Sequence, residues 1–375
     1  MSVAASVMIA VEDPGAANMA ADLPAALAAR GLAASLFAGG AGSAQLDRLG
    51  RPHRRIAAGT TAGALLDEDR PRAVVVGTSE DRSALGLALV DAARGRGIAT
   101  LGLVDGPANA AERFRGTGAA ADTHAPDLIA VADIACRDAF LAAGFAATRL
   151  VVAGHPAFDR ARAERRHLDA RGRAAVRAAV FPDAPAGRPV VVFLSELSDG
   201  LDAARFALTG DETLRGRPGT AERTRAVTEA FLDATAGLAT RPWRVLRLHP
   251  KERREDHADL LDEFDAVSAE GPPFEVLYAA DLVVGLTTFA LVEALLLGRP
   301  ALSLLPRASD AAWLPAIGLG LVPMVCRNAE IAPAVLRFAG REPDAALLAR
   351  HMPEGAAAHL AELIAGRVAV AAGAA

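Results

Sequence analysis

One rhythm is repeated along most of this chain: a short apolar run, a turn of small residues, and then an amphipathic helical segment. This is typical of βαβ units, whose strands pair in parallel and whose helices cover both faces of the sheet. The apolar runs of the first series are residues 3–11, 36–37, 73–76, 100–104, 128–131 and 150–153. After an Arg-rich helical segment the rhythm restarts, with runs at 190–194, 245–248, 281–285 and 301–305.

Two such series predict two domains, which 375 residues are enough to form. We expect an α/β fold of two Rossmann-like, doubly wound domains around a central cleft, with a helix over about 19–30 in the first. The expected ranges are 1–180 for the first domain, 181–189 for a Pro/Gly/Ala-rich linker and 190–343 for the second domain. Residues 344–375 are expected to form a C-terminal helix, broken at Pro353, that crosses back to the first domain, with a frayed tail past Gly366.

Charge and targeting signals argue against several partners. The net charge is −5 and the pI is about 5.9, which predicts neither a nucleic-acid nor an anionic-membrane footprint. The N-terminal segment lacks a basic region of the signal-peptide type, and no uncharged apolar run reaches the roughly 18 residues of a membrane span. We therefore expect a cytoplasmic protein. A peripheral membrane contact and the oligomeric state stay open.

In doubly wound sheets ligands bind at the carboxyl ends of the strands, so the residues that follow each apolar run are the candidates. In the first half these are Glu12, Asp13, Gly15 and Asn18 after one run, and Asp105, Gly106 and Asn109 after another. A carboxylate there is a reasonable general base for a sugar hydroxyl. The alternative is ordinary turn chemistry, with Asp13 or Asn18 as a helix cap.

The second half offers phosphate-binding groups. His249 and Lys251 follow one strand, and the hydroxyls of Thr287 and Thr288 precede a helix whose N–H groups could join them in binding a phosphate. Glu293 is an acid inside that apolar helix and needs a partner such as ribose hydroxyls or an Arg. Two weaker candidates, Ser195 and Glu196, follow the first strand of this half.

Other patterns are set aside. The glycines at 39–42 lack the full dinucleotide fingerprint, and the acidic residues 67–69 precede an apolar strand, as a solvated loop would. Cys136 and Cys326 are far apart and indicate buried thiols. No metal site and no cofactor is expected.

On these residues the second half resembles the donor-binding half of GT-B enzymes, above all in Glu293 followed by apolar residues and Gly298-Arg299-Pro300. In those families the Glu at this spacing binds the nucleotide ribose. The segment 151–160 resembles the crossing segment of 2-epimerase and surface-polysaccharide members, with His155 in place of the usual Asn.

Two further motifs narrow the branch. Val104-Asp105-Gly106 resembles the acidic-acidic-Gly motif of bacterial sialyl- and polysialyltransferases and related capsule enzymes, with Val104 in place of an acid, and His249-Pro250 resembles their HP motif. Thr287-Thr288 would then correspond to their hydroxyl-pair motif.

The resemblance implies a metal-independent glycosyltransferase that moves a sugar from a CMP- or UDP-sugar to a hydroxyl of a sugar or glycolipid acceptor in surface polysaccharide biosynthesis. Asp105, Glu12 or Asp13 would be the base, and His249, Lys251, Thr287 and Thr288 would stabilise the departing phosphate. A UDP-N-acetylglucosamine 2-epimerase-like enzyme ranks second, because the acidic turn at Glu12 replaces the basic turn of that family. A non-catalytic nucleotide-binding scaffold is the third interpretation.

Overall fold

The computed structural model describes residues 6–79, 81–197, 207–249, 252–269 and 273–373, and its chain divides into two compact units. The first unit consists of residues 1–159 and 353–375, and the second of residues 160–352. The expected linker, residues 181–189, lies within the second unit.

The first unit is built on a seven-stranded parallel sheet in the order β3-β2-β1-β4-β5-β6-β7. Its strands are nearly all apolar, as expected where helices cover both faces. The strands are β1 (Ser6–Val11), β2 (Ala33–Ala38), β3 (Arg54–Arg55), β4 (Ala73–Gly77), β5 (Ala99–Val104), β6 (Leu128–Val131) and β7 (Leu150–Val152). The helices are α1 (Pro14–Ala20), α2 (Leu23–Ala28), α3 (Gly40–Arg48), α4 (Ala62–Asp69), α5 (Leu85–Arg94), α6 (Ile134–Ala142), the 3-10 turn Ala147–Arg149 and α16 (Ala356–Gly373).

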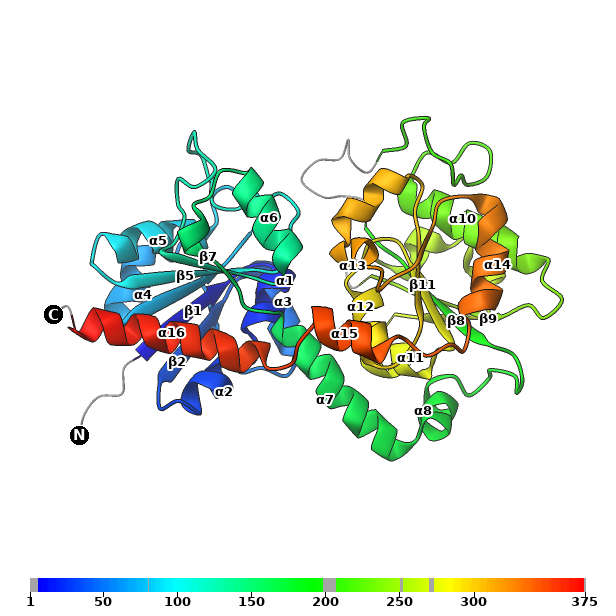
Figure 1. Cartoon of the computed structure of the whole chain (residues 1–375), viewed down its shortest axis with the longest axis horizontal. Helices are drawn as coiled ribbons and strands as arrows, with labels where there is room; N and C mark the ends of the chain where they lie inside the picture. The colour runs from blue at the N-terminus through cyan, green and yellow to red at the C-terminus, as the bar shows by residue number, and fades with distance from the viewer. Residues whose placement is uncertain (1–5, 80, 198–206, 250–251, 270–272, 374–375) are drawn as a thin grey trace. The chain divides into compact units, whose positions relative to one another are not determined.

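Alternation along β1 shows the two faces of this sheet. Val7 and Ile9 join the core formed with α1, α2 and α16, whereas Met8 and Ala10 join the core formed with α4 and α5. Figure 1 shows α16 lying along its face of the sheet, where it packs on α2, β4 and β5.

The second unit repeats the design with a six-stranded parallel sheet in the order β10-β9-β8-β11-β12-β13. Its strands are β8 (Val190–Leu194), β9 (Trp243–Arg247), β10 (Ala266–Ser268), β11 (Leu282–Gly285), β12 (Ala301–Leu304) and β13 (Met324–Val325). Its helices are α8 (Arg173–Val180), α10 (Arg223–Ala236), α11 (Pro273–Ala279), α12 (Ala290–Leu296), α13 (Pro315–Gly318), α14 (Asn328–Phe338) and α15 (Ala345–His351), with 3-10 turns at Arg254–His257, Leu261–Glu263 and Ala308–Trp313. Helix α7 (Pro156–Arg171) begins in the first unit and continues in the second.

The longer predicted strands are confirmed to within two residues wherever the structure describes them. Two helix predictions were wrong. The helix expected over 19–30 is two helices, α1 and α2, because Pro24 stands in the first turn of the second one. The tail past Gly366 is not frayed up to Gly373, because alanine is the strongest helix former and α16 continues through it.

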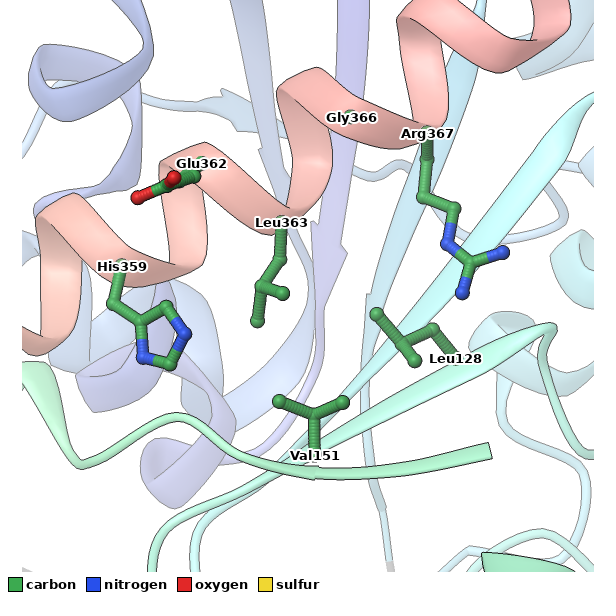
Figure 2. Close-up of a pocket in the computed structure, with 7 residues that line it drawn as sticks. All are labelled: Leu128, Val151, His359, Glu362, Leu363, Gly366 and Arg367. Atoms are coloured by element: carbon green, nitrogen blue, oxygen red, sulfur yellow. The ribbon is translucent and has the colours of Figure 1, made fainter. Parts of the chain in front are cut away.

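A groove of about 490 Å³ opens beside α16 in the first unit (Figure 2). Its floor is apolar and its rim carries charged side chains of the helix; it is lined by Leu128, Val151, His359, Glu362, Leu363, Gly366 and Arg367. Leu128 is the first residue of β6, so the groove lies at the amino end of that strand. No predicted site residue lines it.

Candidate functional site

In both units the strand order reverses beside the first strand, between β1 and β4 and between β8 and β11. Such a switch point leaves a crevice at the carboxyl ends of the strands where ligands of doubly wound sheets bind. Glu12 follows β1 and Glu196 follows β8, so each crevice has a glutamate on its rim.

Glu12 caps a helix across the first crevice. Its carboxylate accepts a hydrogen bond from the backbone N–H of Gly86, at 3.3 Å, in the first turn of α5. The α5 N-cap residue, Ala84, has no side chain that could do this. Burial raises the pKa of Glu12, the hydrogen bonds from Gly86 and Leu85 lower it by less, and the charge of Asp13 adds to the rise.

Asp105 follows β5 and is held by an arginine. Nη1 of Arg113 donates to Asp105 Oδ1 at 2.8 Å and to the hydroxyl of Thr78 at 2.7 Å. Burial acts to raise the pKa of Asp105, but the charge of Arg113, its hydrogen bond and a smaller electrostatic contribution from His155 outweigh it, so the pKa is lowered. Asp105 is therefore fixed as a carboxylate, whereas Glu12 is the more basic of the two acids.

Gly15 lets helix α1 lie close to Asp105. A Cβ atom at this position would lie 1.8 Å from Oδ2 of Asp105, so only glycine fits between α1 and the end of β5. Gly42 approaches the Glu12 backbone as closely, because a Cβ on Gly42 would lie 2.8 Å from the Glu12 carbonyl oxygen.

The other predicted residues of this unit have structural partners. Asp13 is the N-cap residue of α1, without a side-chain capping bond. The side-chain oxygen of Asn18 accepts a hydrogen bond from Gln45 on α3, at 3.0 Å. Gly106 is buried, and Asn109 adopts a positive φ of 56° and accepts the N–H of Arg113, which shapes the turn that carries that arginine.

His155 belongs to the surroundings of Asp105. It follows Gly154, whose φ is +83°, and is 6% exposed. The N–H of Ala157 donates to its Nδ1 at 3.2 Å, and its ring stacks on Phe158. The sequence analysis missed Thr78, although it directly follows β4, and Arg113, which lies eight residues beyond Asp105. It noted His155 only as a departure from a family pattern.

In the second unit the side chain of Glu196 accepts the hydrogen bonds of Thr287 that were predicted to bind a phosphate. Its carboxylate accepts the Thr287 backbone N–H at 2.8 Å and the Thr287 hydroxyl at 2.6 Å. The Thr288 hydroxyl accepts the N–H of Ala290 at 3.3 Å, in the first turn of α12. Thr287 is thus engaged by an internal anion, and the Thr288 hydroxyl accepts the first N–H of α12, whose N-cap residue is Phe289.

Glu252 organises the turn that carries His249. It accepts the His249 backbone N–H at 2.7 Å and the Ser195 hydroxyl at 2.8 Å, and it pairs with His257. Burial opposes ionisation of Glu252, yet the hydrogen bonds from His257 and Ser195 lower its pKa, and the same contact raises the pKa of His257. Lys251 lies outside the described residues.

Glu293 is a desolvated acid on α12. Burial raises its pKa to about 7, and the charge of Arg160 lowers it by a smaller amount. Among the described residues no hydrogen-bond donor reaches this carboxylate. Two hydroxyls of a ligand would supply donors to it.

The described part of the chain contains neither a metal-binding cluster nor a membrane-spanning helix. It contains no cluster of three or more His, Cys, Asp or Glu side chains arranged to hold a metal ion. It also contains no helix that is long and apolar enough to cross a membrane.

Solved structures of nucleotide-sugar enzymes share this architecture. The UDP-GlcNAc 2-epimerase from Neisseria meningitidis bound to UDP-GlcNAc is 12% identical, with a TM-score of 0.62 over 97% of this chain and 100% of that one. The UDP-GlcNAc 2-epimerase from Methanocaldococcus jannaschii is 12% identical, with a TM-score of 0.66 over 96% and 99%. The glycotransferase of kitacinnamycin is 16% identical, with a TM-score of 0.58 over 98% and 100%. No protein-family model and no curated protein sequence matches the chain. The chain therefore has the α/β GT-B fold predicted from its sequence.

Proposed function

We propose that this protein is a metal-independent glycosyltransferase that moves a sugar from a CMP- or UDP-sugar to a hydroxyl of a sugar or glycolipid acceptor. The observation that carries the proposal is the pair of acids at the end of the first sheet, Glu12 and Asp105, whose pKa values are shifted in opposite directions. Environments that separate two pKa values in this way distinguish a base from a fixed charge.

In this proposal Glu12 is the general base, because a carboxylate of raised pKa accepts a proton more readily near neutral pH. It takes the proton of the acceptor hydroxyl as that oxygen bonds to the anomeric carbon of the donor. The bond from the anomeric carbon to the phosphate oxygen breaks, and the nucleotide leaves with the bonding electron pair. Asp105, held by Arg113, orients the acceptor by accepting a hydrogen bond from a second hydroxyl.

The second unit would bind the donor. His249 and the hydroxyl of Thr288 are assigned to the phosphate, where an imidazole N–H and a hydroxyl donate hydrogen bonds that stabilise the departing charge. Glu293 is assigned to the ribose, since its desolvated carboxylate lacks the donors that two hydroxyls provide. Lys251 remains a further candidate for the phosphate.

A UDP-GlcNAc 2-epimerase-like activity is the second candidate, favoured by the similar structures of two such epimerases. It differs in a testable way, because an epimerase converts UDP-GlcNAc without an acceptor, whereas a transferase needs one.

Thermal-shift measurements with CMP, CDP, UDP and GDP test the proposal. A nucleotide that binds only the folded protein raises Tm, and at 100 times its Kd it adds about 2.7 kcal/mol to the unfolding free energy. We expect a shift with CMP or UDP and, with the matching nucleotide sugar, product only when an acceptor is present. Conversion of UDP-GlcNAc alone would favour the epimerase, and no shift with any nucleotide would favour a scaffold without catalysis.

A further inference from the structure

Glu196 is the most firmly held side chain at the second crevice. Both of its carboxylate oxygens are bound to Thr287, across the switch point, and its backbone carbonyl accepts the hydroxyl of Thr224 at 2.6 Å. Its side chain is nevertheless 16% exposed. The carboxylate is therefore fixed in place and still reaches the surface of the crevice.

A buried arginine lies behind this carboxylate. Arg223 is 0% exposed, and its Nη1 donates to Glu196 Oε1 at 3.2 Å. Its Nε donates to Asp310 at 3.2 Å, and its guanidinium lies 4.6 Å from the centre of the Trp313 ring. Glu196 and Asp310 are the two carboxylates that compensate the buried charge of Arg223. If the Glu196 side chain moved away, Arg223 would keep only Asp310, which is strongly unfavourable for a fully desolvated cation. We conclude that Glu196 stays in this position when a ligand enters.

A fixed carboxylate selects ligands by chemistry. It repels a phosphate, and it attracts a hydroxyl or N–H that can donate to its remaining lone pairs. With the phosphate assigned to Thr288 and the ribose to Glu293, the group of the donor still without a partner is the sugar.

We propose that Glu196, positioned by Arg223, is the specificity determinant that accepts a hydrogen bond from a hydroxyl of the transferred sugar and so distinguishes a nucleotide sugar from the free nucleotide. This inference rests on the proposed function, since it presumes a nucleotide-sugar donor in the second unit. The competing interpretation is that the ion network only holds the segment after β8 in place, in which case it would affect folding and not the choice of ligand.

The test is the ratio of two dissociation constants, measured by calorimetry for UDP against UDP-GlcNAc and for CMP against CMP-sialic acid. In Glu196→Gln we expect the dissociation constant of the nucleotide sugar to rise at least tenfold relative to that of the free nucleotide. The variant loses the negative charge that repels phosphate and the carboxylate that accepts the sugar hydroxyl. Glu275→Gln is the matched control, because Glu275 pairs with Arg171 on α7 and lies outside the crevice. Its ratio should stay within twofold of the wild-type value.

Glu196→Asp provides a second variant in case the first does not fold. It keeps the charge but is one methylene shorter, so it cannot reach both Thr287 and Arg223, and the ratio should shift in the same direction. An unchanged ratio in either folded variant overturns the inference and leaves the proposed function standing, as does an equal loss of both ligands. If none of the four ligands binds the wild-type protein, the proposed function itself is overturned and the inference with it.

Discussion

The two units use the same sheet order and place a glutamate at the same point of it, but they surround that glutamate differently. Glu12 is bound by backbone N–H groups alone, and burial raises its pKa. Glu196 is bound by a hydroxyl, a backbone N–H and a buried arginine. A carboxylate of raised pKa that is bound by neutral dipoles can exchange a proton, whereas one that pairs with a buried arginine is held in place by that contact. We therefore propose different tasks for these two glutamates, proton transfer for the one in the first unit and recognition for the one in the second.

The sharpest way to break this comparison is the substitution Glu12→Gln. Glutamine keeps the oxygen that accepts the N–H of Gly86, so α5 stays capped and Tm should change little. Loss of a general base lowers kcat by about 10²–10⁴-fold. We expect this loss in assays with the donor identified by thermal shift, and Glu68→Gln, an exposed partner of Arg54, serves as the control with unchanged kcat.

The pH dependence of the reaction rate in Glu12→Gln shows whether Glu12 acts as a general base or only caps α5. Because the pKa of Glu12 is raised, the wild-type rate should increase with pH through a value above the ordinary 4.5 of a glutamate. This limb should be missing from the residual activity of Glu12→Gln. If the variant retains both the limb and the rate, Glu12 is a helix cap and the base is another group.

Gly15→Ala is expected to have the next largest effect. The new Cβ would overlap Asp105 and push it away from Arg113, with a stability cost of about 1–3 kcal/mol for overpacking. Displacing a positioned group by about 1 Å lowers activity about 10²-fold. Gly63→Ala in α4 is the matched control, because its Cβ would meet only Arg96 at 3.7 Å, and the helix should gain about 0.5–1 kcal/mol. Equal Tm changes in the two variants would contradict the close approach at Gly15.

The sequence was sufficient to predict both sheets because parallel strands buried on two faces are near-continuous apolar runs, as in Val190–Leu194. The edge strands β3, β10 and β13 were missed because their two or three residues do not lie in one of the apolar runs recognised in the sequence, whereas the equally short edge strand β7 lies in the apolar run of residues 150–153. The ends of the apolar runs are visible in the sequence, and for this reason the residues that follow them were predicted as site residues: Glu12, Asp105, Glu196 and Thr287.

The partners of those residues could not be predicted, because they come from segments far away in the sequence. Arg223 lies 27 residues from Glu196, and Thr287 lies 91 residues from it. A phosphate-binding role for Thr287 follows from its local pattern, yet an acid from another strand end binds the same two donors. Local patterns identify the groups available at a sheet edge, and tertiary contacts decide which of them satisfy each other.

A substitution of Glu293 tests whether this buried acid lowers the stability of the protein while it favours nucleotide binding. Its folded-state pKa of about 7 lies above the ordinary 4.5, so the folded state binds the extra proton between these values. The unfolding free energy therefore falls as pH rises from about 4.5 to about 7, by up to about 3 kcal/mol. Glu293→Gln removes this loss, so its Tm should exceed that of the wild type at pH 8 and match it at pH 4.5.

Nucleotide binding should respond in the opposite direction, because an amide offers one acceptor to the ribose where the carboxylate offers two. The exposed-pair variant Glu275→Gln should show neither effect. A Tm difference for Glu293→Gln that is the same at both pH values would show that the carboxylate is not desolvated.

The smallest expected effect concerns two threonines whose hydroxyls accept a backbone N–H at the start of a helix, one in each unit. Thr61 accepts the N–H of Ala64 at 3.2 Å in α4, and Thr288 accepts the N–H of Ala290 in α12. Thr61→Ala removes an N-cap and Thr288→Ala removes one hydrogen bond to the backbone, and each should lower stability by about 1 kcal/mol. Only Thr288→Ala should also weaken nucleotide binding, by about tenfold for one lost hydrogen bond to a charged phosphate. If Thr288→Ala leaves nucleotide binding unchanged, as Thr61→Ala should, the phosphate is bound without Thr288.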